Sequence, residues 1–379
     1  MTRREAFIAL NMIDDLGPVR VRRLLEALKS PEAVWQADEE TLCEVEGIGP
    51  ELARRILTQR NEVDPLEEES RARRIGARII TQEEPEYPEQ LKTIYDPPLV
   101  LYVRGSLEKR DRQALAIVGT RSPTHYGVSM ADRLAYQAAK AGFTIVSGLA
   151  RGIDTVAHKS ALKAGGRTLA VLGSALDRLY PSENAELADR IAENGAVISE
   201  YTLGREPDRS TFPYRNRIVS GLSMGLVVVE ADLKSGALIT ANDAVEQGRS
   251  VFAVPGRADT PHARGCHKLI KQGAVLCEGI DDILDEFDLL LPEARARVDR
   301  TMPTRPPVNL SPDEQAVVRA LWQGPLDVDS LARASGVPIA GLNGLLLGLE
   351  MKKVVRVLPG RLVDLWEGLR AEAPVVRGD

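Results

Sequence analysis

Between Leu115 and Leu276 the sequence alternates short, β-branched apolar runs with longer amphipathic segments of helical length. This alternation is typical of a doubly wound parallel sheet, in which a crossover helix follows each strand. The sequence therefore predicts a Rossmann-like, mostly parallel α/β domain, whose ligands bind at the carboxyl ends of the strands. The predicted strands are Leu115–Gly119, Thr144–Ser147, Thr168–Leu172, Ala196–Ser199, Leu226–Ala231, Ser250–Val254 and Ala274–Leu276.

A helical segment, residues 1–65, precedes this domain, which we place at residues 66–290 including an N-terminal extension. Its short amphipathic helices are joined by glycine turns, as in helix-hairpin-helix and SAM-like domains. Leu16-Gly17-Pro18 and Ile48-Gly49-Pro50 each open a helix that carries arginines, and free N–H groups at such helix starts can receive a phosphate. Plain turns in a helical bundle have the same residues, so both interpretations stay open.

Residues 291–310 are rich in proline and arginine and predict an extended linker. Residues 311–370 predict a winged-helix domain, with three helices followed by the strands Val354–Leu358 and Arg361–Leu365. Its third helix, Ile339–Glu350, contains no Lys or Arg, which direct readout of DNA requires. We therefore expect this helix to pack internally or to contact protein.

Composition limits the function. The 379 residues allow two or three domains, and the sequence has no run of 18 apolar residues and no signal-peptide pattern, so we expect a cytoplasmic protein that does not bind membranes. The three cysteines lack C-x-x-C spacing and are expected to be reduced thiols. A formal net charge of −6 means that any DNA site must be a local basic patch among the 49 Lys and Arg.

Four loops of the sheet domain combine small residues with cations or aromatics. Arginine beside free amides can hold a phosphate, and aromatic or guanidinium planes can stack on the bases of a single strand. The third loop is the richest, but its arginines have a structural alternative, pairing with Glu200 or Glu206. The candidate residues are Gly119, Thr120 and Arg121; Gly148 and Arg151; Phe212, Arg215, Asn216 and Arg217; and Lys234, Ser235 and Gly236.

Two apparent catalytic motifs are discounted. Residues 221–225 match G-x-S-x-G, but a predicted helix precedes them and a strand follows, which reverses the order of a nucleophile elbow. Asp154 and His158 are four residues apart on a predicted helix, yet no third metal ligand is evident. We therefore expect no enzymatic activity, no metal and no cofactor.

Ordered motifs along the sheet domain identify a resemblance. They are Ala116–Arg121, Val146–Asp154, Val171–Gly173 with Tyr180-Pro181 and Asn184, Phe212–Ile218, Val228–Ala231, Ser235–Thr240, Glu246–Arg249 and Val254–Gly256. This succession strongly resembles the DNA-processing protein A (DprA/Smf) family. The N-terminal helical hairpins and the C-terminal winged helix look like those of longer family members.

The resemblance implies a homodimer, formed through the Rossmann-like domain, that binds single-stranded DNA. It also implies that the protein helps to load a RecA-family recombinase during natural transformation and DNA recombination. The DNA pocket would use the four loops, with Arg151 and Lys234 nearby. The family usually has Ser-x-Gly-x-Asn where this chain has residues 263–267, so His267 and its neighbour Lys268 are further candidates. Whether His267 replaces the Asn stays open.

Two other hypotheses remain. The fold also resembles that of nucleotide-hydrolysing lysine-decarboxylase-like proteins, but these carry Pro-Gly-Gly-x-Gly-Thr and a catalytic Glu where this chain has Lys234–Thr240. The third hypothesis is a protein-interaction scaffold in which the basic loops are structural. The DNA hypothesis requires Arg121, Arg215 and Arg217 to converge at one rim of the sheet without being neutralised by buried carboxylates.

Overall fold

The computed structural model describes residues 1–287, 294, 310–352, 354–358 and 362–366. The chain forms two compact units, Met1–Met302 and Pro303–Asp379. Apart from Ala294 and Leu310, the predicted linker at residues 291–310 lies outside the described residues.

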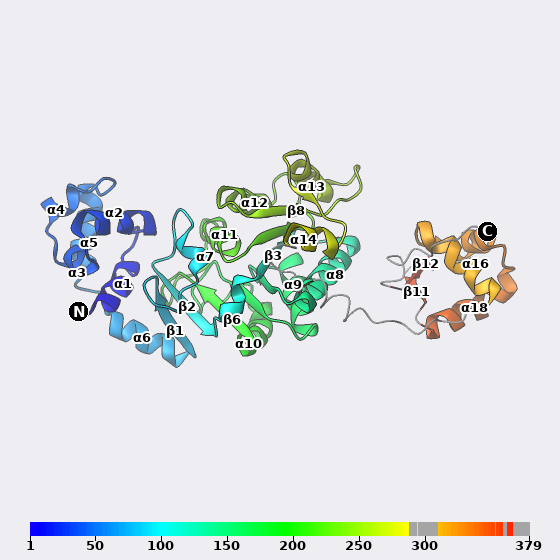
Figure 1. Cartoon of the computed structure of the whole chain (residues 1–379). Coiled ribbons are helices and arrows are strands. Elements are labelled where there is room, and N and C mark those ends of the chain that lie inside the picture. Colours follow the sequence, from blue (N-terminus) through cyan, green and yellow to red (C-terminus); the bar gives the residue numbers. More distant parts are fainter. Residues whose placement is uncertain (288–293, 295–309, 353, 359–361, 367–379) are drawn as a thin grey trace. The chain divides into compact units, whose positions relative to one another are not determined.

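A nine-stranded sheet forms the centre of the larger unit, in the order β1-β2-β6-β5-β4-β3-β7-β8-β9 (Figure 1). All neighbouring pairs from β6 to β9 are parallel, whereas β1 and β2 add antiparallel pairs at one edge. The predicted Rossmann-like, mostly parallel sheet is thus confirmed. The strands are β1 Ala77–Thr81, β2 Val100–Gly105, β3 Ala114–Val118, β4 Thr144–Ser147, β5 Thr168–Val171, β6 Gly195–Ser199, β7 Gly225–Val228, β8 Ser250–Ala253 and β9 Val275–Leu276.

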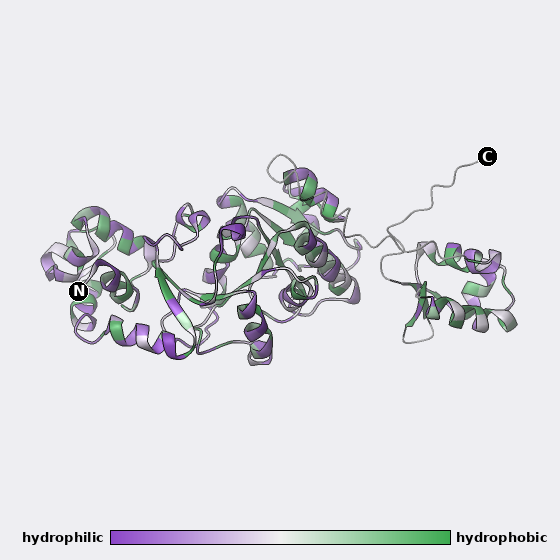
Figure 2. Ribbon diagram, turned by 60° about the horizontal axis from the view of Figure 1, so that its bottom comes forward, coloured by the Kyte–Doolittle hydropathy of each residue, from purple (hydrophilic) through white to green (hydrophobic). Residues whose placement is uncertain are grey.

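Helices cover both faces of this sheet because alternate residues of each buried strand point to opposite sides. Leu115 and Ile117 of β3 pack with α8, α9 and α14, whereas Ala116 and Val118 pack with α11, α12 and α13. The strands are mainly hydrophobic, and the helices alternate polar and apolar residues (Figure 2). These helices, with α7 and α10, are α7 Glu89–Lys92, α8 His125–Ala141, α9 Ile153–Lys163, α10 Ala185–Glu193, α11 Thr211–Gly221, α12 Ala237–Glu246, α13 Pro261–Lys271 and α14 Ile280–Phe287.

The N-terminal helices share a hydrophobic core with the edge of the sheet. Phe7 and Leu24 belong to the same buried cluster as Ile79 of β1 and Tyr102 of β2. The Tyr102 hydroxyl also donates to the buried carboxylate of Glu68, at 2.9 Å. This segment is therefore part of the same compact unit as the sheet. Its helices are α1 Arg3–Asn11, α2 Pro18–Leu28, α3 Pro31–Gln36, α4 Glu39–Cys43, α5 Pro50–Gln59 and α6 Pro65–Arg74.

The smaller unit has the winged-helix arrangement predicted from the sequence. Leu342, Leu346 and Leu349 of its third helix are buried in its own core, whereas Leu347 and Met351 are exposed. A short strand, β10, which the sequence pattern does not indicate, pairs with β12. The elements are α16 Pro312–Ala320, α17 Val328–Ser335, α18 Ile339–Met351, β10 Leu326–Asp327, β11 Val355–Leu358 and β12 Leu362–Leu365.

Among the described residues, no single helix is long and apolar enough to cross a membrane. Only α17 and α18 taken together reach the required length and hydropathy, and they are bent by 100° relative to one another.

Gly152 joins the loops that follow β3 and β4. Its φ is +76°, and a Cβ there would lie 2.4 Å from the Thr120 carbonyl oxygen and 2.7 Å from the Arg121 carbonyl carbon. The next amide, that of Ile153, donates to the same Thr120 oxygen at 3.2 Å. The two loops are therefore held in direct contact, which only a residue without a side chain permits.

We expect Gly152→Ala to lower the free energy of unfolding by about 3 kcal/mol, because the new Cβ overlaps loop backbone and the positive φ becomes strained. Gly165→Ala is the matched control. Gly165 also has a positive φ, +70°, but nothing lies within 4 Å of its Cβ position, so its cost should be about 1 kcal/mol. Denaturant unfolding followed by circular dichroism measures both values, and equal losses would contradict the contact between the loops.

Candidate nucleic-acid interface

The strand order defines one rim of the sheet as the place for a ligand. β3 lies between β4 and β7, so successive crossovers run outward from it in both directions. Such a switch point leaves a crevice at the carboxyl ends of the strands. Three of the four predicted loops, those after β3, β4 and β7, lie at this rim, and α11 contributes the fourth set of residues.

A small hollow of about 30 Å³ lies at this rim, and we call it the Arg121 hollow. It brings together residues from three of the predicted loops and from the segment after β5. The exposed Arg121 guanidinium lies 5.5 Å from the centre of the Phe212 ring. The Tyr180 ring centre lies 5.7 Å from that of Phe212. The lining residues are Arg121, Gly148, Ala150, Arg151, Tyr180, Pro181 and Phe212.

This arrangement can hold a nucleotide through two kinds of contact. The Arg121 and Arg151 guanidinium groups are exposed and can pair with phosphate. The Phe212 and Tyr180 rings can stack on a base. Tyr180, which is 42% exposed, is absent from our sequence-based candidates. The signal that could have found it is the Tyr180-Pro181 motif, which is part of the family resemblance.

Arg215 supports the hollow from below. It is only 4% exposed, and its guanidinium donates to the Gly148 carbonyl at 2.8 Å and to the Val171 carbonyl. Burial lowers the pKa of Arg215 to about 10, and the nearby Asp154 carboxylate opposes that shift. These donors tie α11 to the ends of β4 and β5, and the DNA contact expected of Arg215 stays a prediction.

Asp154 and His158 also have structural roles. Asp154 accepts hydrogen bonds from the amides of Gly148, at 3.1 Å, and Ala150, at 3.4 Å, and burial raises its pKa. His158 Nδ1 lies 2.7 Å from the Thr168 hydroxyl, and burial lowers the pKa of this histidine to about 3. In the part of the chain that the structure describes, no three His, Cys, Asp or Glu side chains converge as a metal ion would require.

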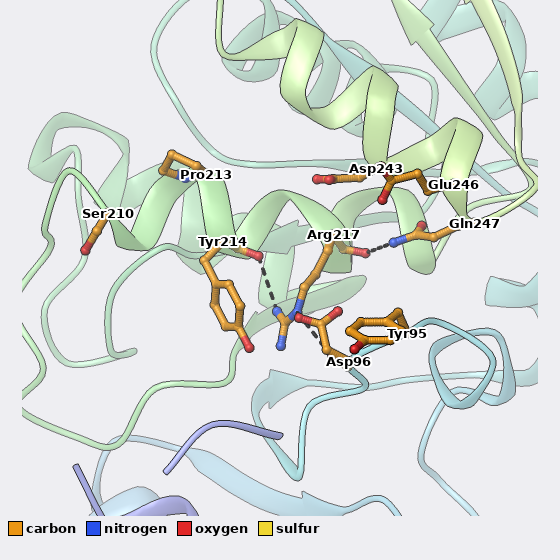
Figure 3. A pocket seen from close by; sticks show the side chains of 9 residues that line it. All are labelled: Tyr95, Asp96, Ser210, Pro213, Tyr214, Arg217, Asp243, Glu246 and Gln247. Atoms are coloured by element: carbon orange, nitrogen blue, oxygen red, sulfur yellow. Dashed lines mark hydrogen bonds and ion pairs between the residues drawn. The ribbon is translucent and has the colours of Figure 1, made fainter. Parts of the chain in front are cut away.

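Arg217 is neutralised inside the protein (Figure 3). Its guanidinium donates to both Glu200 oxygens at 2.7 Å and to an Asp96 oxygen at 2.8 Å. Although burial opposes the charge, Glu200 keeps the pKa of Arg217 above its usual value. The alternative pairing with Glu200 is therefore the one that the structure has. The DNA hypothesis, in the form that needs three converging and unneutralised arginines, fails at Arg217, and the exposed cations that line the Arg121 hollow are Arg121 and Arg151. Glu206, the other carboxylate considered, pairs with Arg178 instead.

Comparison with known proteins identifies the family. Residues 78–288 match the family described as DNA recombination-mediator protein A. Residues 7–62 match the SAM-like helix-hairpin-helix tandem, and residues 301–361 match the DprA winged helix domain. The chain belongs to the DNA recombination-mediator protein A family.

Relatives of this family resemble the chain over most of its length. Protein Smf of Synechocystis is 37% identical over 93% of this chain and 96% of its own length, and DNA processing protein DprA of Bacillus subtilis is 45% identical over 56% and 72%. The solved DNA processing protein A of Streptococcus pneumoniae has a TM-score of 0.66 and 32% identity, covering 76% of this chain and 98% of the other. That of Helicobacter pylori, studied for its single-stranded DNA binding mode, has a TM-score of 0.50 and 34% identity, covering 57% and 96%.

The remaining family positions lie outside the Arg121 hollow. Lys234 and Gly236 are exposed just before α12, where Asn216 Nδ2 donates to the Gly236 carbonyl at 3.5 Å. At the family's Asn position, His267 Nε2 lies 3.0 Å from the Gly256 carbonyl, within its own part of the sheet domain. Its neighbour Lys268 is exposed. DNA contact by Asn216, Lys234, Ser235, Gly236, His267 and Lys268 stays a prediction.

A larger cleft of about 470 Å³ lies on the other side of α11, and we call it the acidic cleft (Figure 3). Burial raises the pKa of Asp243 to about 6, and the negative charges of Glu246 and Asp96 add to that shift. Asp243 and Glu246 would repel a polyanion, so this cleft is a poor site for one. The residues lining the acidic cleft are Tyr95, Asp96, Ser210, Pro213, Tyr214, Arg217, Asp243, Glu246 and Gln247.

Replacing Arg217 tests its structural role. We expect Arg217→Met to lower the free energy of unfolding by about 3–5 kcal/mol, because the buried Glu200 carboxylate loses its partner. Arg209→Met is the control, since Arg209 is exposed shortly before α11. Denaturant unfolding measures both losses. If Arg217→Met were as stable as the control, the ion pair would not hold this side of α11 in place.

The raised pKa of Asp243 predicts that replacing this residue by the neutral Asn increases stability by an amount that depends on pH. Folding raises this pKa from 3.8 to about 6, so the folded state binds the proton more tightly than the unfolded state does. Ionisation of Asp243 therefore lowers the free energy of unfolding as the pH rises from about 4 to 6. Asp243→Asn should therefore raise the unfolding free energy by about 1 kcal/mol at pH 7, a value reduced for partial solvent exposure, and by nothing at pH 4. Thermal denaturation at both pH values measures the gain in stability, and Glu86→Gln, at an exposed position, is the control. An equal gain in stability from Asp243→Asn at pH 4 and at pH 7 would contradict the raised pKa.

Proposed function

We propose that this chain binds single-stranded DNA at the Arg121 hollow and acts as a recombination mediator. The observation that carries the proposal is the exposed Arg121 guanidinium 5.5 Å from the centre of the Phe212 ring, with Tyr180 and Arg151 lining the same hollow at the carboxyl ends of the strands. Cations for the backbone and rings for the bases are the two contacts by which proteins hold unpaired strands without sequence preference.

Gly148 lines this hollow, and Gly119 and Thr120 directly precede Arg121 in its loop. Glycine at position 119 permits close packing, because a Cβ there would lie 2.7 Å from Ile153. Thr120 is partly exposed beside Arg121. Gly148 carries the carbonyl that Arg215 binds. These three positions shape the loops, and Arg121, Arg151 and Phe212 make the direct contacts.

The biological role we propose is loading of a RecA-family recombinase onto single-stranded DNA in the cytoplasm, in natural transformation and DNA recombination. The family description as a recombination mediator supports this role. We further propose a homodimer through the Rossmann-like domain. Ile239, Val245 and Leu276 are exposed apolar side chains on α12 and on β9, and β9 is an edge strand of the sheet, where a second copy can pack.

The nucleotide-hydrolysing alternative has less support. Its catalytic Glu has no counterpart in the Lys234–Thr240 loop. Glu230, directly before this loop, is buried and accepts hydrogen bonds from the Thr124 amide at 2.9 Å and the Thr124 hydroxyl at 2.5 Å. That carboxylate is used to start α8, so we propose a binding protein and not an enzyme.

Charge reversal at Arg121 tests the proposed function. Arg121→Glu should weaken binding to a labelled single-stranded oligonucleotide by about tenfold or more at moderate salt, because a phosphate contact is replaced by repulsion. Arg110→Glu is the matched control. It makes the same change in net charge at an exposed position before β3, at the opposite rim of the sheet. Fluorescence anisotropy measures both affinities.

Two results would overturn the proposed function. One is equal affinity of Arg121→Glu and Arg110→Glu for the oligonucleotide. The other is wild-type protein that binds a duplex of the same length as tightly as the single strand, since stacking on Phe212 and Tyr180 requires unpaired bases.

A further inference from the structure

Arg151, one of the two exposed cations of the Arg121 hollow, already has a partner in the free protein. Its Nε and one terminal nitrogen each donate to an oxygen of Glu183 at 2.7 Å. The two side chains are 54% and 55% exposed, and the hydrogen bonds from Arg151 lower the pKa of the Glu183 carboxyl. The Glu183 carboxylate therefore accepts hydrogen bonds from the same two N–H groups of Arg151 that a phosphate would bind.

The protein backbone holds Glu183 in this place. Glu183 lies in the short 3₁₀ helix Ser182–Asn184, directly after the Tyr180-Pro181 segment that lines the hollow. The neighbouring Asn184 is buried, and its Nδ2 donates to the Leu149 carbonyl and to the Thr155 hydroxyl, both at 2.9 Å. Leu149 and Arg151 belong to the same loop. The carboxylate is thus anchored to the loop that carries its partner.

We propose that Glu183 is a built-in competitor for the DNA phosphate at Arg151, and that it sets the affinity of the Arg121 hollow. This inference rests on the proposed function. While the pair is closed, Arg151 is neutralised and Arg121 is the exposed cation that remains among the residues lining the hollow. Exposed ion pairs contribute little to stability, so a phosphate held by Arg121 and the aromatic rings can displace Glu183 and take both donors of Arg151.

A positioning role for Glu183 predicts the opposite result. If the carboxylate served to hold Arg151 in the orientation that DNA requires, removing its charge would free the arginine and weaken binding. If it competes with phosphate, removing its charge strengthens binding. The sign of the change in affinity therefore separates the two roles.

The test compares Glu183→Gln with Glu186→Gln. Both side chains are exposed, three residues apart, and each substitution removes one negative charge, so long-range electrostatics change equally. At low salt, Glu183→Gln should bind a single-stranded oligonucleotide about three- to fivefold more tightly than wild type. The gain in affinity from Glu186→Gln should be less than half as large. The advantage should shrink as salt rises, because screening weakens the competing ion pair.

A double-substitution cycle links the gain to Arg151. In the Arg151→Gln background, Glu183→Gln should give no more gain than Glu186→Gln does, because the competitor then has no cation to occupy. The inference is overturned if Glu183→Gln binds like Glu186→Gln or more weakly than wild type, or if its gain persists without Arg151. Wild-type protein that bound no single strand would instead overturn the proposed function itself.

Discussion

The buried guanidinium of Arg215 is the contact on which the site depends. Its hydrogen bonds to the Gly148 and Val171 carbonyls join α11 to the carboxyl ends of β4 and β5. A Cβ on Gly148 would lie 2.5 Å from this guanidinium, so the fit leaves no space for a side chain. Because Phe212 lies one turn before Arg215 on the same helix, this contact also fixes the ring against which Arg121 stacks.

Charge pairing explains how a chain with a formal net charge of −6 can carry a cationic site. Carboxylates near the rim are used inside the protein: Asp154 by backbone amides, Glu230 by Thr124, and Glu200 by Arg217. Asp243 and Glu246 lie across α11, in the acidic cleft. The helix thus separates a cationic hollow from an acidic cleft, and local placement of charge decides where a polyanion can bind.

The architecture was predictable from the spacing of apolar residues and from the small residues that follow the strands. The seven predicted strands all occur, because β-branched runs bounded by glycine have few other ways to bury themselves. The antiparallel β1 and β2 were harder to place. The sequence analysis placed their segments in an N-terminal extension. Pairing of β2 with β6, which is distant in sequence, joins β2 to the sheet, and β1 is added by pairing with β2.

Which arginine of α11 faces the site was not predictable in the same way. Helical geometry places Phe212, Arg215 and Asn216 on one face, with Arg217 turned well away. Applying that periodicity to residues 212–217 would have separated Arg217 from the ring. Its burial depends on Asp96, a residue 121 positions away, and sequence spacing carries no signal for such a contact.

In the function we propose, preference for an unpaired strand follows from the rings of the Arg121 hollow more than from its charge. At about 30 Å³ the hollow is too small to enclose a base. Because the Phe212 and Tyr180 rings are tilted by 52° to one another, a flat base can stack on one ring at a time. In a duplex both faces of each base are covered by its neighbours, and only the backbone can reach the two arginines. Cation contacts alone bind both forms of DNA, whereas stacking is open only to the single strand. Because Glu183 competes for Arg151, the cation contacts are weaker for both single-stranded and duplex DNA, whereas stacking on the rings is unaffected. The ion pair therefore lowers total affinity while it increases the share of binding that distinguishes single strands from duplex.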